Sequence, residues 1–429
     1  MRYVGLDIHK KTVVFCILGE DGAVHERGKL PCTKEALESF GENTLQTDDH
    51  VALEATTHCW AVVDVLEPSV ERIVVSNPLQ TRAIAAAKIK TDRIDARILA
   101  ELLRSDFLPV VWQPDAQTRR LRRLTHRRAS LVRQRTAIKN RIHSTLAMRL
   151  ISVPSLFSKK GLERLDAIEL DEETEEAVES DLRLLGSLSR EIEALEQTIA
   201  EQAYELEDVR LLMTLPGVNV TVAMGLLAAW GDVGRFKTPD KAAAYLGLVP
   251  STRQSGDHCY HGPITKQGRS HARWLLIQAA QHVDRHPGPL GAFFRRLAHK
   301  KNRNVAVVAT ARKMAVIAWH MLRNREPYRY ALPRNTESKL ASLRVRATGE
   351  RRKRGQAKGT PRPASYGSGR RTRGVRSLQQ VYEVEGLPPA VDELPPGERR
   401  MIEEAKLTGF LKKIGTPTRI PRKSTGNAE

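Results

Sequence analysis

The stretch Lys90-Thr91-Asp92-Arg93-Ile94-Asp95-Ala96-Arg97 predicts a helix that lies on a core and carries two carboxylates in its first turn. Thr91 is a residue type that often caps the N-terminus of a helix. Behind it, apolar residues recur four positions apart, at Ile94, Ile98 and Leu102. Asp92 and Asp95 are three residues apart, so both carboxylates leave the same side of the helix.

This acidic pair has two interpretations. Two carboxylates so close together repel each other unless a cation lies between them, and a hard divalent ion is the usual solution. The simpler interpretation is a solvated acidic first turn, which suits the helix dipole. For the pair alone the simpler interpretation is favoured, and the residues upstream change the balance.

The residues upstream predict an α/β domain over residues 1–110. Three successive strands are followed by strands and helices in alternation, and then by the helix of the acidic pair. The predicted strands span residues 3–8, 12–18, 24–30, 50–55 and 72–76, and the predicted helices between them span 34–40 and 59–66. The first three strands are predicted to be antiparallel.

Two further carboxylates lie in these strands. Asp7 lies near the end of the first strand and Glu54 at the end of the fourth. Because functional groups gather at strand ends in such sheets, four carboxylates converge on one edge if these two strands are neighbours. One or two Mg²⁺ ions would stabilise them together, activate a nucleophile and neutralise charge on a phosphoryl group. Singly, each residue is an ordinary polar group, but the set of four favours a metal site: Asp7, Glu54, Asp92 and Asp95.

The composition limits the partners of the chain. Its 429 residues suffice for two or three domains, and its formal net charge of +20 indicates a polyanion, most simply nucleic acid. A membrane surface would also attract this charge, but we find no run of about 18 apolar residues and no signal peptide, so we expect neither a membrane span nor export, and no membrane partner. The four scattered cysteines fit neither a disulfide framework nor a zinc module, and they are consistent with a reducing cytoplasm.

Residues 111–208 form a predicted basic and coiled-coil segment. A helix within 115–150 is rich in arginine, and Arg119, Arg123 and Arg127 are its candidates for contact with a phosphate backbone. The alternative is the solvated face of a helical hairpin. The next helix begins acidic and then has the spacing of a coiled-coil seam, formed by Leu185, Leu188, Ile192, Leu195 and Ile199. Helices of opposite charge pair with each other or with another subunit, and the sequence leaves both open.

Residues 209–333 form a predicted C-terminal helical domain. The turn Leu215-Pro216-Gly217-Val218 separates two helices, and a glycine there leaves backbone N–H groups free for a phosphate. A plain inter-helix turn is nearly as well supported. Farther on, Ser255-Gly256 lies in a predicted polar loop, where most serines are turn residues. Cations that would stabilise a phosphate attacked by a hydroxyl follow it closely: Lys266, Arg269 and Arg273.

Residues 334–429 differ in character from the rest. The part from Arg344 to Arg376 is rich in Arg, Lys, Gly, Ser and Pro and poor in apolar residues. We predict that this extension is basic, largely disordered and a non-specific contact for polyanions. Short helical patterns occur within residues 378–415, and the sequence indicates no role for them.

Several of these motifs resemble a known family. The segments around the carboxylates resemble the DEDD motif of the one-ten family of bacterial insertion-sequence transposases, whose relatives include the Piv-type DNA invertases. These segments are Gly5-Leu6-Asp7-Ile8-His9-Lys10, Leu53-Glu54-Ala55-Thr56 and Lys90-Thr91-Asp92-Arg93-Ile94-Asp95-Ala96. The C-terminal transposase domain of that family is resembled, in order, by Leu215-Pro216-Gly217-Val218, Tyr245-Leu246-Gly247-Leu248-Val249-Pro250, Ser255-Gly256 and Gly262-Pro263-Ile264-Thr265-Lys266-Gln267-Gly268. The resemblance covers about residues 1–330.

The resemblance implies a RuvC-like (RNase H-like) N-terminal domain, a coiled-coil linker and a helical C-terminal domain. It implies that Asp7, Glu54, Asp92 and Asp95 bind Mg²⁺ and that Ser255 attacks DNA to form a 5′-phosphoserine link. It further implies a structured guide RNA, the bridge RNA, that pairs with donor and target DNA. The active protein would be a homo-tetramer in the bacterial cytoplasm, associated with the nucleoid. In it, the RuvC-like domain of one subunit meets the serine domain of another.

The chain departs from the family pattern in two places. The family often has a second glycine after Ser-Gly, where this chain has Asp257, so the geometry around Ser255 is not inherited. The extension after residue 334 lies beyond the family core.

Two other functions compete with an RNA-guided recombinase. The first is a RuvC-type metal-dependent nuclease in which water attacks and Ser255 is structural. The second is a non-catalytic nucleic-acid-binding protein with a degenerate sheet, against which the intact set of four carboxylates argues.

Overall fold

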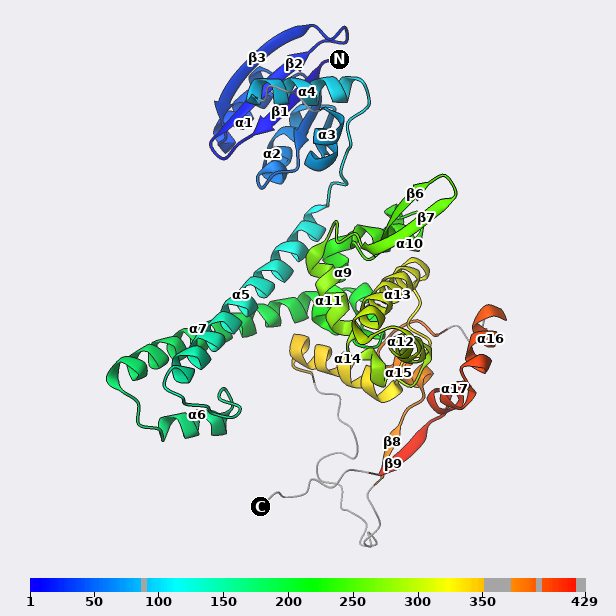
Figure 1. The fold of residues 1–429 in the computed structure, drawn as a ribbon. Coiled ribbons are helices and arrows are strands. Elements are labelled where there is room, and N and C mark those ends of the chain that lie inside the picture. Colours follow the sequence, from blue (N-terminus) through cyan, green and yellow to red (C-terminus); the bar gives the residue numbers. More distant parts are fainter. Residues whose placement is uncertain (86–90, 351–371, 391–395, 422–429) are drawn as a thin grey trace. The chain divides into compact units, whose positions relative to one another are not determined.

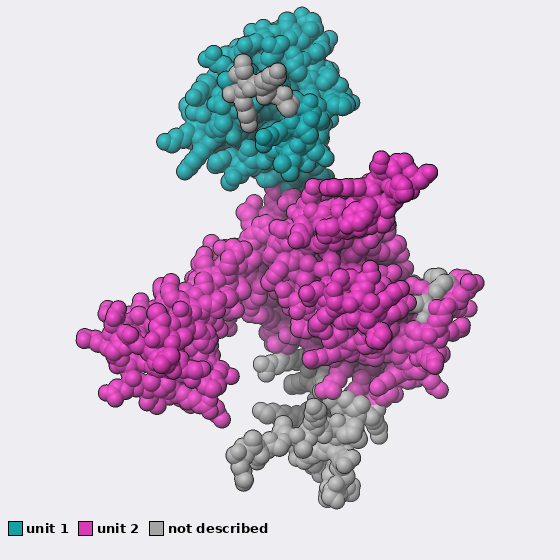
Figure 2. All heavy atoms as spheres, in the orientation of Figure 1, with its two compact units in different colours: residues 1–114 teal, residues 115–429 magenta. Residues whose placement is uncertain are grey.

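The computed structural model describes residues 1–85, 91–350, 372–390 and 396–421. The chain divides into two units, residues 1–114 and residues 115–429 (Figure 2). Each unit has cores of its own. Lys90 and the basic stretch 351–371 lie outside the described residues, so the predicted disorder of that stretch stays a prediction.

The first unit contains a five-stranded sheet in the order β3-β2-β1-β4-β5 (Figure 1). The strands β1, β2 and β3 are antiparallel, whereas β4 and β5 run parallel to β1. Their bounds are β1 (Tyr3–Ile8), β2 (Thr12–Leu18), β3 (Val24–Pro31), β4 (His50–Glu54) and β5 (Arg72–Ser76). All five predicted strands are confirmed, and the first and fourth strands are neighbours, as a shared acidic edge requires.

Helices cover both faces of this sheet. The helices α1 (Lys34–Asn43) and α2 (Cys59–Leu66) pack on the face that carries Leu6 and Leu53. On the opposite face, α4 (Asp92–Arg104) packs through Ala96 and Leu99. Because side chains alternate between faces along a strand, each strand contributes to two cores. The sequence prediction omitted the short helices α3 (Pro78–Ile84) and η1 (Glu67–Ser69).

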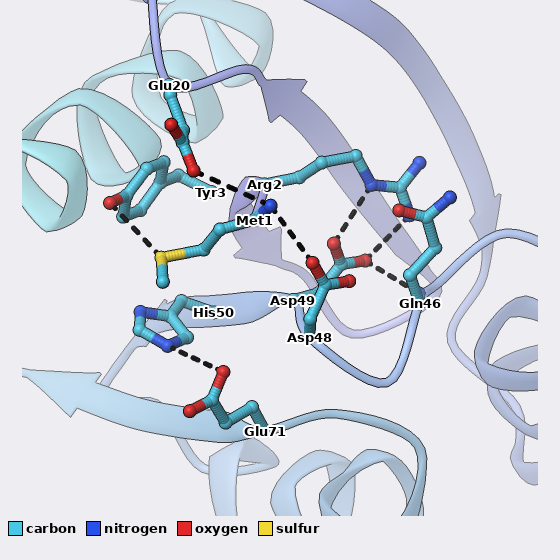
Figure 3. A network of polar contacts seen from close by, with 9 residues as sticks. All are labelled: Met1, Arg2, Tyr3, Glu20, Gln46, Asp48, Asp49, His50 and Glu71. Carbon is cyan, nitrogen blue, oxygen red and sulfur yellow. Dashed lines mark hydrogen bonds and ion pairs between the residues drawn. The ribbon is translucent and has the colours of Figure 1, made fainter.

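A polar network fixes the start of β1 beside β4 (Figure 3). The Arg2 guanidinium donates through Nε to Oδ1 of Asp49 at 2.9 Å, and the fully buried Asp49 carboxylate also accepts from the backbone N–H of Gln46 at 2.8 Å. The backbone N–H of His50 donates to the Arg2 carbonyl at 2.9 Å. A buried carboxylate is stable only when it is paired in this way. The network therefore holds the two strands that carry Asp7 and Glu54 in one register.

The second unit is mostly helical. A long hairpin of α5 and α7, with α6 in its connection, leads into a bundle that also holds a small β-hairpin (Figure 1). The bounds of the hairpin and the bundle are α5 (Ala116–Ala147), α6 (Lys159–Asp166), α7 (Glu172–Glu205), α8 (Glu207–Met213), α9 (Val220–Trp230), η2 (Val233–Arg235), α10 (Pro239–Tyr245), β6 (Pro250–Ser255), β7 (His258–Ile264), α11 (Ser270–Ala280), η3 (Val283–Arg285), α12 (Pro289–Lys300), α13 (Arg303–Asn324) and α14 (Pro333–Thr348). Later elements are β8 (Thr372–Val375), α15 (Leu378–Val384), α16 (Pro396–Glu404), α17 (Thr408–Gly415) and β9 (Thr418–Pro421).

The helices α5 and α7 pair with each other within the chain, which is one of the two arrangements that the sequence left open. One end of the predicted seam packs with the C-terminal half of α5, and Ile199 at the other end belongs to the core of the bundle. Ion pairs cross the hairpin: Arg128 Nε lies 2.9 Å from Oε1 of Glu196, and Arg141 Nε lies 2.7 Å from Oδ2 of Asp181. The basic residues of α5 and the acidic residues of α7 therefore neutralise part of each other's charge.

The helix α13 lies in the core of the bundle. Among the described helices it is the one long and apolar enough to cross a membrane, judged by length and composition alone. However, 56% of its apolar window is buried inside the protein, and Ala311, Met314 and Ala318 are fully buried in the largest core. These contacts are those of a core helix.

The prediction that residues 334–429 are largely disordered is wrong for α14, whereas the short helical patterns predicted within 378–415 are confirmed by α15, α16 and α17. The helix α14 packs through Leu340 and Leu343 on the main core, and Tyr382 of α15 is fully buried there. The Tyr382 hydroxyl donates to the Tyr328 carbonyl at 2.6 Å. The error arose because basic and small residues dominate the composition, whereas a few well-spaced apolar residues suffice to dock a helix.

Candidate active site

Gly5 allows α4 to lie directly on β1. A Cβ built on Gly5 would lie 1.9 Å from the Ala96 carbonyl oxygen, so no side chain fits at this crossing. The helix begins as predicted, because the Thr91 hydroxyl accepts from the backbone N–H of Ile94 at 3.4 Å. The close approach brings the first turn of α4, which contains Asp92, to the end of β1.

Asp7 and Asp92 meet there around His9. The Nε2 atom of His9 lies 3.1 Å from Oδ2 of Asp7 and 3.3 Å from Oδ2 of Asp92. One ligand atom from each of the three residues lies within 4.8 Å of the others. His9 lies in the segment around Asp7 but was not predicted as a site residue. Its spacing from Asp7 was the available signal, since residues i and i+2 straddle the end of a strand.

Glu54 belongs to the same edge by register. The last paired residues of β1 and β4 are Leu6 and Leu53, so Asp7 and Glu54 occupy the next position on each strand. Neighbouring strands lie about 4.8 Å apart. Both residues follow the alternation of Gly5 and Ala52, which face α4, rather than that of Leu6 and Leu53.

The electrostatics of this edge suit a cation. Burial raises the pKa of Asp7 above its ordinary value, His9 opposes this, and the charges of Asp92 and Asp95 raise the pKa further. Asp95 is therefore close enough to act on Asp7. Carboxylate oxygens with one imidazole nitrogen form a donor set that divalent metals accept. The residues present fit such an ion, and half-exposed Asp92 leaves its site open to a substrate.

Ser255 lies in the second unit, at the tip of a β-hairpin rather than in the predicted polar loop. It ends β6 and is exposed, and Gly256 follows it with a φ of +57°. Asp257 has no positive φ, so the turn has its left-handed residue at the first central position, as in a type II′ turn. The left-handed φ therefore favours glycine at position 256, whereas the backbone at Asp257 does not call for glycine.

His258, opposite Ser255 in the hairpin, was also not predicted as a site residue. The hairpin register pairs Ser255 directly with His258 across the turn. Side chains directly opposite each other project from the same face of a two-stranded ribbon. An imidazole in this position can accept a proton from a serine hydroxyl. The pattern Ser-Gly-Asp-His would have revealed the pair only if the hairpin had been recognised.

The three cations after the hairpin have different surroundings. Lys266 is exposed and adopts a left-handed φ of +56°. Arg269 donates through Nε to the Tyr245 hydroxyl at 3.1 Å, and Arg273 donates to the Leu246 carbonyl at 2.9 Å. Both arginines are half-buried, and their hydrogen bonds hold the residues that end α10, just before the hairpin.

The candidate arginines of α5 form one stripe at a spacing of four. Arg123 and Arg127 are exposed, whereas Arg119 is half-buried. Arg122, on the neighbouring side, donates to the carbonyls of Ala228 and Ala229 at 2.7 and 3.2 Å, where α9 ends. The helix therefore has both an exposed basic face and arginines that serve the fold.

Comparisons with known proteins match two stretches of the chain, and the first stretch extends past the boundary between the two units. One family model, described as a transposase, matches residues 4–149, and a second, described as the transposase IS116/IS110/IS902 family, matches residues 209–295. The chain is similar to the transposase for insertion sequence element IS1111A of Coxiella burnetii, at 29% identity over 56% of this chain and 68% of that protein. It is also similar to the transposase for insertion sequence element IS1328 of Yersinia enterocolitica, at 28% identity over 54% of this chain and 71% of that protein. A pilin gene-inverting protein of Moraxella lacunata is 24% identical over 76% of this chain and 97% of that protein.

Proposed function

Because the chain belongs to the IS116/IS110/IS902 family of transposases, we propose that it excises and inserts an insertion sequence through a covalent link between DNA and Ser255. The two family models together span more than half of the chain. Transposases act on DNA, and this family makes the chain a DNA-recombining enzyme. The observation that carries the finer proposal is the exposed serine on a glycine turn, in a chain that also holds a clustered acidic edge.

In the proposed reaction the Ser255 hydroxyl oxygen attacks the phosphorus of a DNA phosphodiester. The bond from phosphorus to the 3′ oxygen breaks, one strand leaves with a 3′ hydroxyl, and the other stays on the protein as a 5′-phosphoserine. His258 is our candidate for the base that accepts the serine proton and then donates it to the leaving 3′ oxygen. When a 3′ hydroxyl attacks the phosphoserine, the strands are rejoined and the proton returns to Ser255. The number of phosphoester bonds is conserved, so no ATP is needed.

The family implies a divalent metal, and Asp7, His9 and Asp92 form an acidic candidate metal site. We propose Mg²⁺, held by Asp7, Glu54, Asp92 and Asp95. When bound, such an ion polarises a phosphate and neutralises charge on it. The protein's own contribution is orientation, because His9 fixes the carboxylates of Asp7 and Asp92 and the register of β1 and β4 fixes Glu54.

Other finer features of the family are part of the same proposal. They are a RuvC-like first unit, a coiled coil of α5 and α7, a guide RNA, a cytoplasmic homo-tetramer and sites shared between subunits. The strand order of the first unit and the pairing of α5 with α7 support the first two. The net charge of +20 and exposed Arg123, Arg127 and Lys266 support contact with nucleic acid. Arg119, Arg269 and Arg273 are proposed to support those contacts.

The experiment that tests the serine mechanism is adduct mapping. The full chain is expressed with its native flanking DNA and Mg²⁺, the nucleic acid is digested, and mass spectrometry locates any nucleotide remnant. We expect a remnant on Ser255 that is absent from Ser255→Ala and from Asp92→Ala. Ser251→Ala is the matched control, because Ser251 lies in the same hairpin and donates to the Pro263 carbonyl at 3.1 Å.

The other outcomes favour the competing functions. DNA cleavage without any protein-linked remnant would reject the serine mechanism and favour a nuclease that uses water. DNA binding without cleavage, unchanged in Asp7→Ala and Asp92→Ala, would favour a non-catalytic binding protein.

A further inference from the structure

A pocket of about 630 Å³ lies in the second unit, beside the turn Leu215-Pro216-Gly217-Val218. It is bounded by this turn and the start of α9, by η3 with the residues around it, and by α14. Its volume is within the range of pockets that hold small ligands. The proposed serine chemistry uses none of its lining residues.

The charged lining of the pocket is entirely basic. Arg285, Lys339 and Arg346 line it, together with His282 and His286, and no carboxylate lines it within the described residues. Arg346 is paired on one side with Glu196, at 3.0 Å. A concave site with cations and no acid of its own favours an anionic ligand.

Lys339 presents an ammonium group to this turn from far along the chain. Its Nζ donates to the carbonyls of Leu215 and Val218, at 3.0 and 2.9 Å. An ammonium has three N–H donors, so one remains after these two bonds. Burial lowers the pKa of Lys339 to about 7, and a nearby anion would favour the charged form.

His286 supplies a second donor that is buried. Its side chain is 7% exposed, and its Nδ1 accepts from the backbone N–H of Gly288 at 3.1 Å. Burial and the charges of Lys339 and Arg295 lower its pKa to about 4, so the ring is neutral and carries its proton on Nε2. That Nε2 atom has no hydrogen-bond partner in the described part of the chain. A buried donor without a partner is costly, which a ligand acceptor would relieve.

The start of α9 adds backbone donors. Asn219 caps the helix, and its side chain accepts from Val222. The N–H groups of Val220 and Thr221 precede the helix's own hydrogen bonds and carry the positive end of its dipole. Met213 and Leu343, on neighbouring walls, give the pocket an apolar side.

We propose that this pocket binds a phosphate group of a nucleic-acid strand, with the attached sugar and base against its apolar side. The phosphate accepts from Lys339, His286 and the start of α9, while Arg285 contacts it at the rim. That the phosphate belongs to a nucleic-acid strand rests on the proposed function. The pocket would then hold this strand at a place separate from the Ser255 hairpin. The same phosphate chemistry occurs in a free nucleotide, which the test distinguishes.

The test measures binding without cleavage. Fluorescence anisotropy follows a labelled single-stranded oligonucleotide on full-length Ser255→Ala protein over a range of salt concentrations. In this background we expect Lys339→Met and Arg285→Gln each to weaken binding about fivefold or more, and to reduce the salt slope by about one phosphate contact. Lys313→Met is the matched control, because it removes an exposed lysine of α13 outside the pocket and is expected to show a smaller effect.

Competition distinguishes the two sources of phosphate. Adenosine monophosphate should displace part of the bound oligonucleotide from the Ser255→Ala protein. It should displace none of the oligonucleotide that still binds when Lys339→Met is added. The proposal is overturned if Arg285→Gln and Lys339→Met both match Lys313→Met. A different result would be that adenosine monophosphate raises the melting temperature of the protein while Lys339→Met and Arg285→Gln leave the affinity for the oligonucleotide unchanged. In that case the pocket binds a free nucleotide and not a nucleic-acid strand. Arg285 is exposed, so its variant keeps the test valid if Lys339→Met fails to fold. Adduct formation on Ser255 is scored separately, so either proposal can fail alone.

Discussion

Gly5 lies where α4 crosses β1, and an added side chain there meets backbone atoms that have no free space to move into. We expect Gly5→Ala to lower the free energy of unfolding of the first unit by about 1–3 kcal/mol, as overpacked cores do. It should also abolish recombination, because α4 must shift and take Asp92 away from Asp7. Urea denaturation and the adduct assay measure the two effects.

The control for Gly5→Ala is Gly186→Ala. A Cβ at Gly186, in α7, meets nothing closer than 3.9 Å, and alanine favours a helix over glycine. This variant should be neutral or slightly more stable. If Gly5→Ala behaves in the same way, the close crossing does not hold the acidic edge together.

Half-buried His271 and buried His286 predict how stability depends on pH. Burial, with cationic neighbours, lowers the pKa of His271 and of His286 to about 4, from 6.5. Between these values the unfolded chain binds protons that the native chain does not, so the free energy of unfolding falls as the pH is lowered from 6.5 to 4. Above pH 6.5 the contribution is complete. The expected loss is on the order of a few kcal/mol at pH 4.

Denaturation curves at several pH values between 4.5 and 7.5 measure this loss. The double variant His271→Gln/His286→Gln should lose less stability than the wild type on acidification. Parallel pH dependence in the two proteins would mean that other groups, chiefly carboxylates, account for the loss.

At the scale of single residues, the sequence indicated two of the three residues that the structure brings together at the end of β1. Asp7 and Asp92 were selected because acidic residues at a strand end and in a first helical turn have a recognisable spacing. His9 and Gly5 were not selected because their contacts depend on which helix crosses which strand. That contact joins residues far apart in the chain.

Among the elements, the hairpin of α5 and α7 depends on Arg128 and Glu196. Arg128 lies close to Glu196, which also contacts Arg346, and these interactions hold the pKa of Glu196 below its ordinary value despite burial. A double-mutant cycle with Arg128→Ala and Glu196→Ala should give a coupling energy of about 1–2 kcal/mol. Urea denaturation of the four proteins provides it.

The exposed pair of Arg183 and Glu179, on α7 alone, is the control for this cycle. Such surface pairs contribute little, so no measurable coupling is expected there. Equal coupling in both pairs would mean that the contact between the two helices adds nothing to the Arg128 interaction.

The elements also show where sequence patterns fail. A seam at heptad spacing has the same sequence whether its partner is in the same chain or in another, so only the structure distinguishes the two cases. The hairpin of β6 and β7 escaped prediction because its residues 252–260 are all exposed. Such a ribbon lacks the alternation of apolar and polar residues by which strands are recognised.

For the molecule as a whole, the first unit should fold without the second. Residues 1–114 contain a complete sheet with a core on each face. We expect this fragment to unfold cooperatively on heating and to keep its α/β circular dichroism spectrum. A fragment that is unfolded at 25 °C would show that the second unit is needed to form the first.

At the same scale, composition was informative about partners and misleading about boundaries. The net charge indicated nucleic acid, in agreement with a family that acts on DNA. The boundary drawn at residue 334, however, fell inside α14, which begins at Pro333. Net charge is a sum over residues and does not depend on the fold. A domain boundary, in contrast, depends on contacts between segments that are distant in the sequence.

The docking of α14 has a practical consequence for anyone who wishes to shorten this gene. A stop codon at residue 334 would match the family models and would leave the carboxylates and Ser255 intact. It would also delete Lys339, which holds the carbonyls of Leu215 and Val218, and Tyr382, which fills the bundle. A shortened version of the protein should therefore keep α14 and α15.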